Sequence, residues 1–130
     1  VVIDKTLNTS KFIELNLKNI KSEREWIVPS NKEILNISSN EEIARQLRVL
    51  SLKSDKNLSI NLGTGLGQTL ENYFNYFDSI IKTKTNHKMD NEIEGVYLQQ
   101  NDYDNKALFD EIGYKPLETI YSLFKEVSLS

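Results

Sequence analysis

The middle of the chain changes its hydrophobic period across a run of glycines. Residues 58–62 alternate apolar and polar side chains, which is typical of a β-strand, and Gly63, Gly65 and Gly67 follow at once. From about residue 69 to residue 83 the apolar side chains recur at helical spacing instead. A strand that turns through glycines into a helix is a building unit of layered α/β folds. We therefore predict an α/β protein with a tight structural turn at these glycines.

Strand and helix patterns also alternate along the rest of the chain. Short extended segments are predicted at residues 1–3, 25–28, 34–37 and 96–98, and further helices at residues 12–20, 41–50, 105–112 and 117–127. Ser10 and Asn40 are the expected N-caps of the first two helices. Gly113 and Pro116 are expected to stop one helix and start the next. No repeat or linker divides the sequence, so we expect residues 1–130 to form a single domain or fragment.

Composition excludes several classes of function. Sixteen basic and nineteen acidic residues leave a formal net charge of -3, without the basic excess that is typical of nucleic-acid binding. The absence of cysteine excludes disulfide scaffolds, thiolate zinc sites and cysteine nucleophiles, and it is compatible with the reducing cytoplasm, where we expect the protein. Apolar runs are too short to cross a bilayer, so no membrane partner is expected. Because the chain opens on apolar, strand-like residues at Val1, we expect a piece of a longer protein.

The glycine run lacks the full fingerprint of a dinucleotide-binding loop. That fingerprint needs glycine at its first, third and sixth places. Counted from Gly63 the sixth place is Gln68, and counted from Gly65 it is Leu70. The Gly-Lys-Ser/Thr of a nucleoside triphosphate loop is also missing. We therefore predict no cofactor-binding residue here.

Other groups that could carry chemistry are isolated. His87 is the single histidine and lies in a polar stretch that predicts an exposed loop. Glu41 and Glu42 open a helix without calcium-loop spacing and are interpreted as helix-terminal or surface charge. The aromatic residues of 73–77 recur at helical spacing and are predicted to be core rather than a base-stacking platform. No catalytic residue and no metal site is predicted.

Three segments agree in order and spacing with motifs of one enzyme family. Residues 59–71, which begin Ser-Ile-Asn-Leu-Gly-Thr-Gly and end Gln-Thr-Leu-Glu, resemble its (F/Y)N(L/I)GTG-x-G-x-S-V-x-E segment. Upstream, residues 42–44 (Glu-Ile-Ala) resemble the end of R-D-F-I-x-V-x-D-V-A. Downstream, residues 101–117 resemble D-x-S-K-A-x-x-x-L-G-W-x-P-x-x-x-L, with Tyr114 where tryptophan is commoner. Over about residues 34–127 the chain resembles the extended short-chain dehydrogenases, which are the NAD-dependent nucleotide-sugar epimerases and dehydratases.

The resemblance implies a Rossmann-type epimerase/dehydratase fold, with NAD as the cofactor of the parent enzyme and a nucleotide sugar as its substrate. In the family, the cofactor fingerprint and a Tyr-x-x-x-Lys catalytic pair lie in the N-terminal part, and we find neither at a matching place in this chain. Tyr121 and Lys125 have the right spacing, but they fall in the terminal helix, where the family has no catalytic pair. The resemblance therefore implies the substrate-side part of an enzyme whose N-terminal cofactor domain is missing.

The diphosphate-binding residues of the family are missing as well. Related enzymes hold the substrate diphosphate with two arginines, because a guanidinium fork matches phosphate oxygens in pairs. The aligned positions fall near Leu35 and at Glu92 and Ile93. The basic residues that remain as candidate anion contacts are Arg24, Lys32, Arg45 and Arg48, and the first three are the predicted substrate-binding residues.

Three functions are compatible with these observations. The first is the substrate-side portion of an NAD-dependent nucleotide-sugar epimerase/dehydratase-like protein, which does no chemistry by itself. The second is a non-catalytic binding or oligomerisation module derived from that fold, with a second copy of the chain as its partner. The third is an unrelated small α/β interaction domain that shares only a glycine turn with the family.

Overall fold

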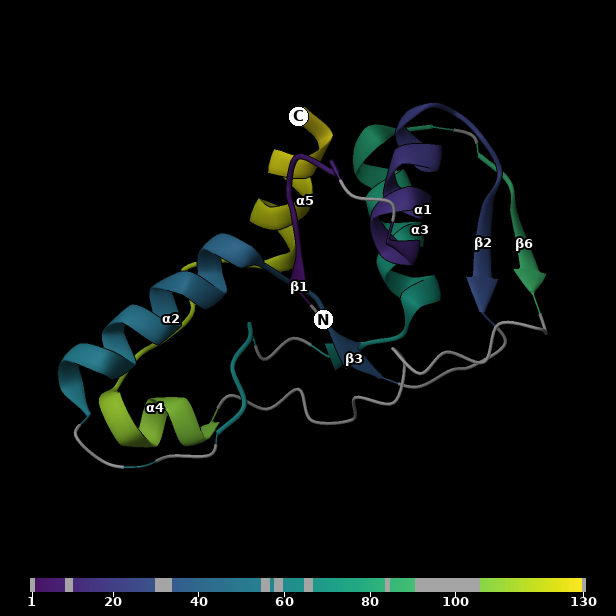
Figure 1. Ribbon diagram of the computed structural model, residues 1–130. Coiled ribbons are helices and arrows are strands. Elements are labelled where there is room, and N and C mark those ends of the chain that lie inside the picture. The colour runs from purple at the N-terminus through teal and green to yellow at the C-terminus, as the bar shows by residue number, and fades with distance from the viewer. Residues whose placement is uncertain are drawn as a thin grey trace.

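The computed structural model describes residues 2–8, 11–29, 34–54, 57, 60–64, 67–83, 85–90 and 106–129. Along these residues the elements follow in the order β1 (Val2–Ile3), α1 (Phe12–Lys21), β2 (Trp26–Pro29), β3 (Leu35–Asn36), β4 (Ser38–Ser39), α2 (Asn40–Lys53), β5 (Gly67–Gln68), α3 (Leu70–Ile81), β6 (His87–Asp90), α4 (Lys106–Ile112) and α5 (Ile120–Leu129). Short strands alternate with helices, which confirms the predicted α/β class (Figure 1).

In the described residues the strands associate in pairs. β1 runs parallel to β4, and β2 runs parallel to β6, with Trp26 opposite His87. β3 and β5 are antiparallel and place Asn36 opposite Gly67. Figure 1 shows the β2–β6 pair at one end of the molecule and helices α2 and α4 at the other, with α1, α3 and α5 between them. Parallel pairs need long crossover connections, so each joins segments that lie far apart in the sequence.

One apolar core joins α1, α3, α5 and β2. The rings of Tyr73 and Phe77 on α3 meet Phe124 of α5 edge-on, with ring centroids 6.0 and 5.2 Å apart. Trp26 of β2 meets Phe74 in the same way at 5.4 Å. All five side chains are at most 1% exposed, which confirms the prediction of a core role for these residues of α3. Edge-to-face ring pairs stabilise a core beyond the area that they bury.

Helix α2 buries polar side chains instead of apolar ones. Glu42 and Gln46 are both 0% exposed, whereas Leu47 is 54% exposed. Glu42 lies in the first helical turn, as expected for a helix-terminal charge, but it is not at the surface. The N-cap is Ser39 rather than Asn40, because the Ser39 Oγ accepts a hydrogen bond from the backbone N–H of Glu42 at 3.1 Å. A hydroxyl at this place pairs an amide that the first helical turn leaves without a partner.

Other local predictions differ from the structure or lie outside it. Residues 60–62 form no strand, and the first two residues of that predicted strand lie outside the described residues. His87 begins strand β6 and stacks on Trp26 with ring centroids 4.5 Å apart, so the predicted loop is wrong. Pairing with the distant β2 makes this polar segment a strand, because strand formation depends on its neighbours more than on its own residues. Tyr76 is 39% exposed rather than core. The predicted strand at 96–98 and the predicted cap Ser10 lie outside the described residues.

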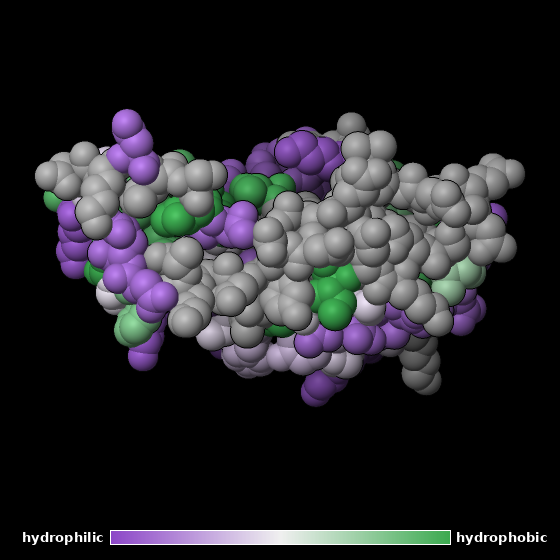
Figure 2. Space-filling model, turned by 90° about the horizontal axis from the view of Figure 1, so that it is seen from below, coloured by the Kyte–Doolittle hydropathy of each residue, from purple (hydrophilic) through white to green (hydrophobic). Residues whose placement is uncertain are grey.

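The surface is mixed in polarity. The large apolar side chains with the greatest exposure are Leu52, Leu117 and Leu129, at 72–79%. On the face shown in Figure 2, the coloured hydrophobic residues form separate patches between hydrophilic ones. Among the described residues, no helix combines the length and the apolar character that crossing a membrane would need.

Gly63 lies where a side chain has no room. A Cβ atom added there would stand 2.4 Å from Nδ2 of Asn36 and 3.4 Å from Oγ of Ser38. Asn36 is held in place, because it is buried and its Oδ1 accepts hydrogen bonds from the hydroxyl groups of Ser38 and Thr64. Gly113 follows the end of α4 at φ 68°, and a Cβ atom added there would meet nothing within 4 Å.

We therefore expect Gly63→Ala to lower the free energy of unfolding by about 2–4 kcal/mol, because the new methyl group displaces Asn36. Gly113→Ala is the matched control, with an expected loss of about 1–2 kcal/mol from its left-handed backbone alone. Urea unfolding at neutral pH measures both losses. A loss for Gly113→Ala that equals or exceeds the loss for Gly63→Ala would contradict the steric explanation.

A second prediction concerns the hydroxyl group of Tyr73, which accepts a hydrogen bond from the backbone N–H of Ile37 at 3.3 Å inside the core. Burial raises the pKa of Tyr73 to about 12, from a model-peptide value of 10.0. The protonated form is favoured in the folded state, so its stabilisation is complete below pH ~10 and is lost as the pH rises toward ~12. Across that interval, the stability advantage of the wild type over Tyr73→Phe should fall by about 2–3 kcal/mol.

Urea unfolding at several pH values in this interval measures that advantage. Tyr121→Phe, which removes a hydroxyl group from an exposed ring on α5, is the control for effects of substitution alone. A wild-type advantage over Tyr73→Phe that stays constant with pH would show that burial of this hydroxyl group does not control the titration.

Candidate functional site

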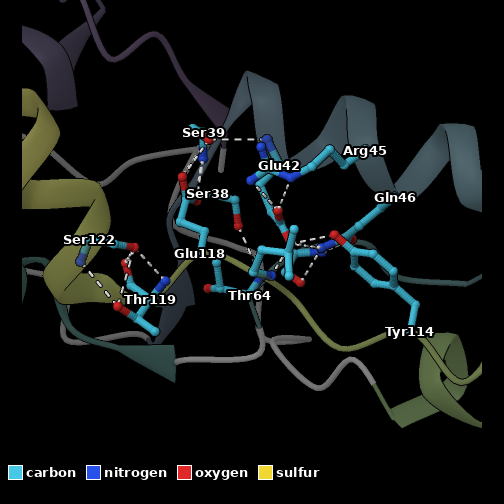
Figure 3. Close-up of polar contacts among 12 residues, drawn as sticks. Ser38, Ser39, Glu42, Arg45, Gln46, Thr64, Tyr114, Glu118, Thr119 and Ser122 are labelled. Atoms are coloured by element: carbon cyan, nitrogen blue, oxygen red, sulfur yellow. Dashed lines mark hydrogen bonds and ion pairs between the residues drawn. The ribbon is translucent and has the colours of Figure 1, made fainter.

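The buried carboxylate of Glu42, on the first turn of α2, is the centre of a polar network (Figure 3). One of its oxygens, Oε2, accepts hydrogen bonds from Nε and from a terminal nitrogen of Arg45 at 2.9 and 2.5 Å. The other, Oε1, accepts from the Gln46 amide, the Tyr114 hydroxyl and the Leu117 backbone N–H, each at 3.2 Å. Five donors thus satisfy a carboxylate that is 0% exposed.

A second buried carboxylate, Glu118, is joined to the first through Ser39. Its two oxygens accept from the Ser39 backbone N–H at 3.0 Å and from the Ser39 hydroxyl at 2.5 Å. The same hydroxyl oxygen accepts from the backbone N–H of Glu42. The Nζ atom of Lys5, which follows β1, lies 3.7 Å from a carboxylate oxygen of Glu118 and 2.5 Å from one of Glu126 on α5. The start of α2 is therefore tied to both β1 and the segment before α5.

The glycine turn is held by the same network. Gln46 forms two hydrogen bonds with Gly63, one from its amide nitrogen to the Gly63 carbonyl at 2.8 Å and one from the Gly63 N–H to its oxygen at 2.9 Å. The Thr64 N–H donates to the Ser38 Oγ at 3.1 Å. The backbone amides of Gly63 and Thr64 are thus already paired within the protein. A phosphate-binding loop needs such amides directed at its ligand, so these two do not form one.

The charges of the network keep its donors protonated. Desolvation acts to lower the pKa of Arg45, but the hydrogen bond and charge of Glu42 outweigh it and raise that pKa. Partial burial, together with the negative charge of Glu42, raises the pKa of Tyr114. A fully paired carboxylate with protonated donors is suited to anchoring segments rather than to proton transfer. Among the described residues, no three His, Cys, Asp or Glu side chains gather as a metal site would need.

The structure separates the predicted substrate contacts. Arg45 is paired with Glu42 on α2, and its side chain is 39% exposed. Arg24 lies in the connection between α1 and β2, at the opposite end of the molecule from α2 (Figure 1). Lys32 lies outside the described residues, as do the positions of Glu92 and Ile93. Leu35 lies in β3.

Of the predicted turn residues, Gly63 and Gly113 have positive φ angles. Gly67 belongs to β5 and lies opposite Asn36 of β3. Pro116 lies in the connection between α4 and α5. Gly65 lies outside the described residues.

The sequence analysis did not predict that Glu42, Ser39 and Glu118 form the centre of a buried polar network. One pattern could have indicated it, because Glu42 stands where the resembled motif R-D-F-I-x-V-x-D-V-A has its second carboxylate. Tyr114 stands where the downstream motif has an aromatic residue, and it donates to that same carboxylate. Two of the matched segments, together with Gly63 of the third, therefore meet in one network.

This fold is that of part of the NAD-dependent nucleotide-sugar epimerases and dehydratases, which confirms the predicted relation at the level of the fold. The chain superimposes on UDP-glucose 4-epimerase from Thermotoga maritima with a TM-score of 0.80, at 14% identity over 98% of this chain. It superimposes on RMD from Pseudomonas aeruginosa, solved with NADPH, with a TM-score of 0.79 at 14% identity over 98% of the chain.

A third similar structure is UDP-N-acetylglucosamine 4-epimerase from Methanobrevibacter ruminantium in complex with UDP-N-acetylmuramic acid, with a TM-score of 0.74 and 20% identity over 97% of this chain. The chain spans 42–44% of the length of these three proteins. No protein-family profile matches the sequence, and no curated protein matches it significantly.

The network yields a prediction about two adjacent glutamates. Glu42→Gln places an amide nitrogen among donors and removes the partner charge of Arg45, so we expect it to lower the free energy of unfolding by about 2–4 kcal/mol. Glu41→Gln changes the neighbouring exposed residue in the same way and should alter stability by less than about 0.5 kcal/mol. Urea unfolding at neutral pH compares them, and equal losses in the two variants would refute the anchoring role.

Proposed function

We propose that this chain is the substrate-side portion of an NAD-dependent nucleotide-sugar epimerase/dehydratase-like protein. The observation that carries the proposal is the meeting of the matched segments at Glu42. Residues 42–44, 61–64 and 113–117 are separated in the sequence, yet their hydrogen bonds converge on Glu42 and its neighbour Gln46. Chance similarity in three short segments would give no reason for them to be joined in space.

In the proposed enzyme, chemistry is divided between two parts. A cofactor domain N-terminal to this portion would hold NAD and the catalytic Tyr/Lys pair, while this portion would close over the nucleotide sugar. Two solved proteins of similar fold contain NADPH and UDP-glucose respectively, and this chain spans 44% and 42% of their length, which leaves room for a second part in such a protein. The Glu42 network would then hold the segments around the substrate in place. By itself the portion carries out no reaction, and the protein works in the cytoplasm.

One observation favours a second function, a non-catalytic binding or oligomerisation module derived from the same fold. The position aligned with one diphosphate-binding arginine of the family falls near Leu35, and Arg45 is held by Glu42. An aliphatic side chain cannot bind phosphate, and a paired guanidinium has fewer donors for it. In this alternative the fold persists while the nucleotide site is lost.

Calorimetry of the 130-residue chain with two ligands separates these functions. UDP, which carries the nucleotide and diphosphate without the sugar, should bind with a Kd of about 1 mM or tighter if this portion contacts the substrate. NAD should give no binding at about 1 mM, because the glycine turn lacks the fingerprint and the amides of Gly63 and Thr64 are already paired. Binding of NAD at micromolar concentration would overturn the proposal, and absence of UDP binding would favour the module.

A pair of variants tests the candidate contact Arg24. If its guanidinium binds the diphosphate, Arg24→Gln should weaken UDP binding about tenfold, since a charge-assisted hydrogen bond is lost. Lys53→Gln removes an exposed positive charge from the last turn of α2 and serves as the control. Equal affinity in the two variants would exclude Arg24 from the site.

A further inference from the structure

A pocket of about 400 Å³ lies between the start of α3 and the start of α5, apart from the Glu42 network. The lining residues that the structure describes come from β5, α3 and α5 and carry no charge: Gln68, Asn72, Tyr73, Asn75, Tyr76 and Ile120. This volume is near the lower end of the range of ligand sites, which is roughly 300–1,000 Å³. It therefore suits one small ring system better than a dinucleotide.

Three side-chain amides give the pocket both donors and acceptors. Asn72 Nδ2 donates to the Gln68 Oε1 at 3.2 Å, which fixes the two amides relative to each other. This bond does not use the Asn72 Oδ1 acceptor or the Gln68 Nε2 donor. The Asn75 amide makes no hydrogen bond with any other residue that the structure describes, although it lies one helical turn from Asn72 on α3. The amides thus offer hydrogen bonds that the protein does not use.

The remaining walls are apolar and aromatic. Tyr73 is 1% exposed, whereas the Tyr76 ring is 39% exposed and tilts against Phe124 with centroids 6.1 Å apart. Ile120, at the first turn of α5, adds an aliphatic surface. No Lys, Arg, His, Asp or Glu is among the lining residues that the structure describes, so these residues give a phosphate or carboxylate no positive counter-charge.

We propose that this pocket binds a neutral hexopyranose ring, either a free monosaccharide or the end of a glycan. Such a ring has hydroxyl groups on its edge for the amides of Gln68, Asn72 and Asn75, and C–H groups on its faces for Tyr76 and Ile120. A nucleotide sugar bound through its diphosphate needs cationic side chains, and the described lining residues include none. The pocket therefore defines a ligand site beyond the proposed function of the chain.

Nuclear magnetic resonance of the ¹⁵N-labelled chain tests the proposal through its side-chain amide signals. Glucose and N-acetylglucosamine, titrated separately, should shift the signals of Gln68, Asn72 and Asn75 in a saturable manner, with a Kd in the range of about 1–50 mM. Asn75→Ala should weaken this binding about fivefold, because one neutral hydrogen bond is lost. Since Asn75 is exposed and holds no internal bond among the described residues, the variant should unfold at the wild-type temperature.

Asn40→Ala, an exposed asparagine on α2, is the control and should leave the affinity unchanged. Uridine and glucose 6-phosphate form two further arms of the experiment. Any one of three outcomes would overturn the assignment: neither sugar shifts these signals, Asn75→Ala binds with the affinity of the wild type, or uridine or glucose 6-phosphate binds more tightly than glucose. Failure of UDP to bind in calorimetry would leave this result intact, because UDP contains no hexose.

Discussion

Burial of the Glu42 carboxylate is the interaction on which the α2 end of the molecule depends. A carboxylate without access to water is tolerated only where a cation and hydrogen-bond donors replace that water. Arg45 supplies the charge, and Gln46, Tyr114 and the Leu117 amide supply the other donors. Because these donors come from two separate segments, satisfying one side chain also fixes the position of α2 against the connection between α4 and α5.

The two ends of the molecule are stabilised by different forces. At the end that carries β2 and β6, rings and aliphatic side chains of α1, α3 and α5 form a continuous apolar core. At the other end, the buried side chains of α2 are Glu42 and Gln46. Apolar packing is non-directional and tolerates small shifts, whereas hydrogen bonds to a buried charge lose their value quickly when a partner moves. Geometry is therefore specified most tightly where the motif segments meet.

The polar network and the pocket have opposite chemical characters. In the network, charged groups are paired with one another, so few donors remain for a ligand. The described lining residues of the pocket between α3 and α5 are uncharged, and their amide groups retain hydrogen-bonding capacity. Enzymes of similar fold have been solved with NADPH and with UDP-glucose, and the proposed function would place this chain beside a nucleotide site. In that proposal the network would hold the segments rigid, and the pocket would be a separate site for a neutral ligand.

Local patterns in the sequence determined the α/β class, the long aromatic helix α3 and its buried face, because helical periodicity and glycine punctuation act over neighbouring residues. Only the tertiary structure decided that Glu42 is buried and that His87 belongs to a strand. Tyr114 and Leu117 lie 72 and 75 residues from Glu42, and His87 becomes a strand residue by pairing with Trp26. A glutamate in the first turn of a helix has the same neighbours in the sequence whether its carboxylate faces water or five hydrogen-bond donors. Its burial depends on partners that the folded chain alone brings within hydrogen-bonding distance.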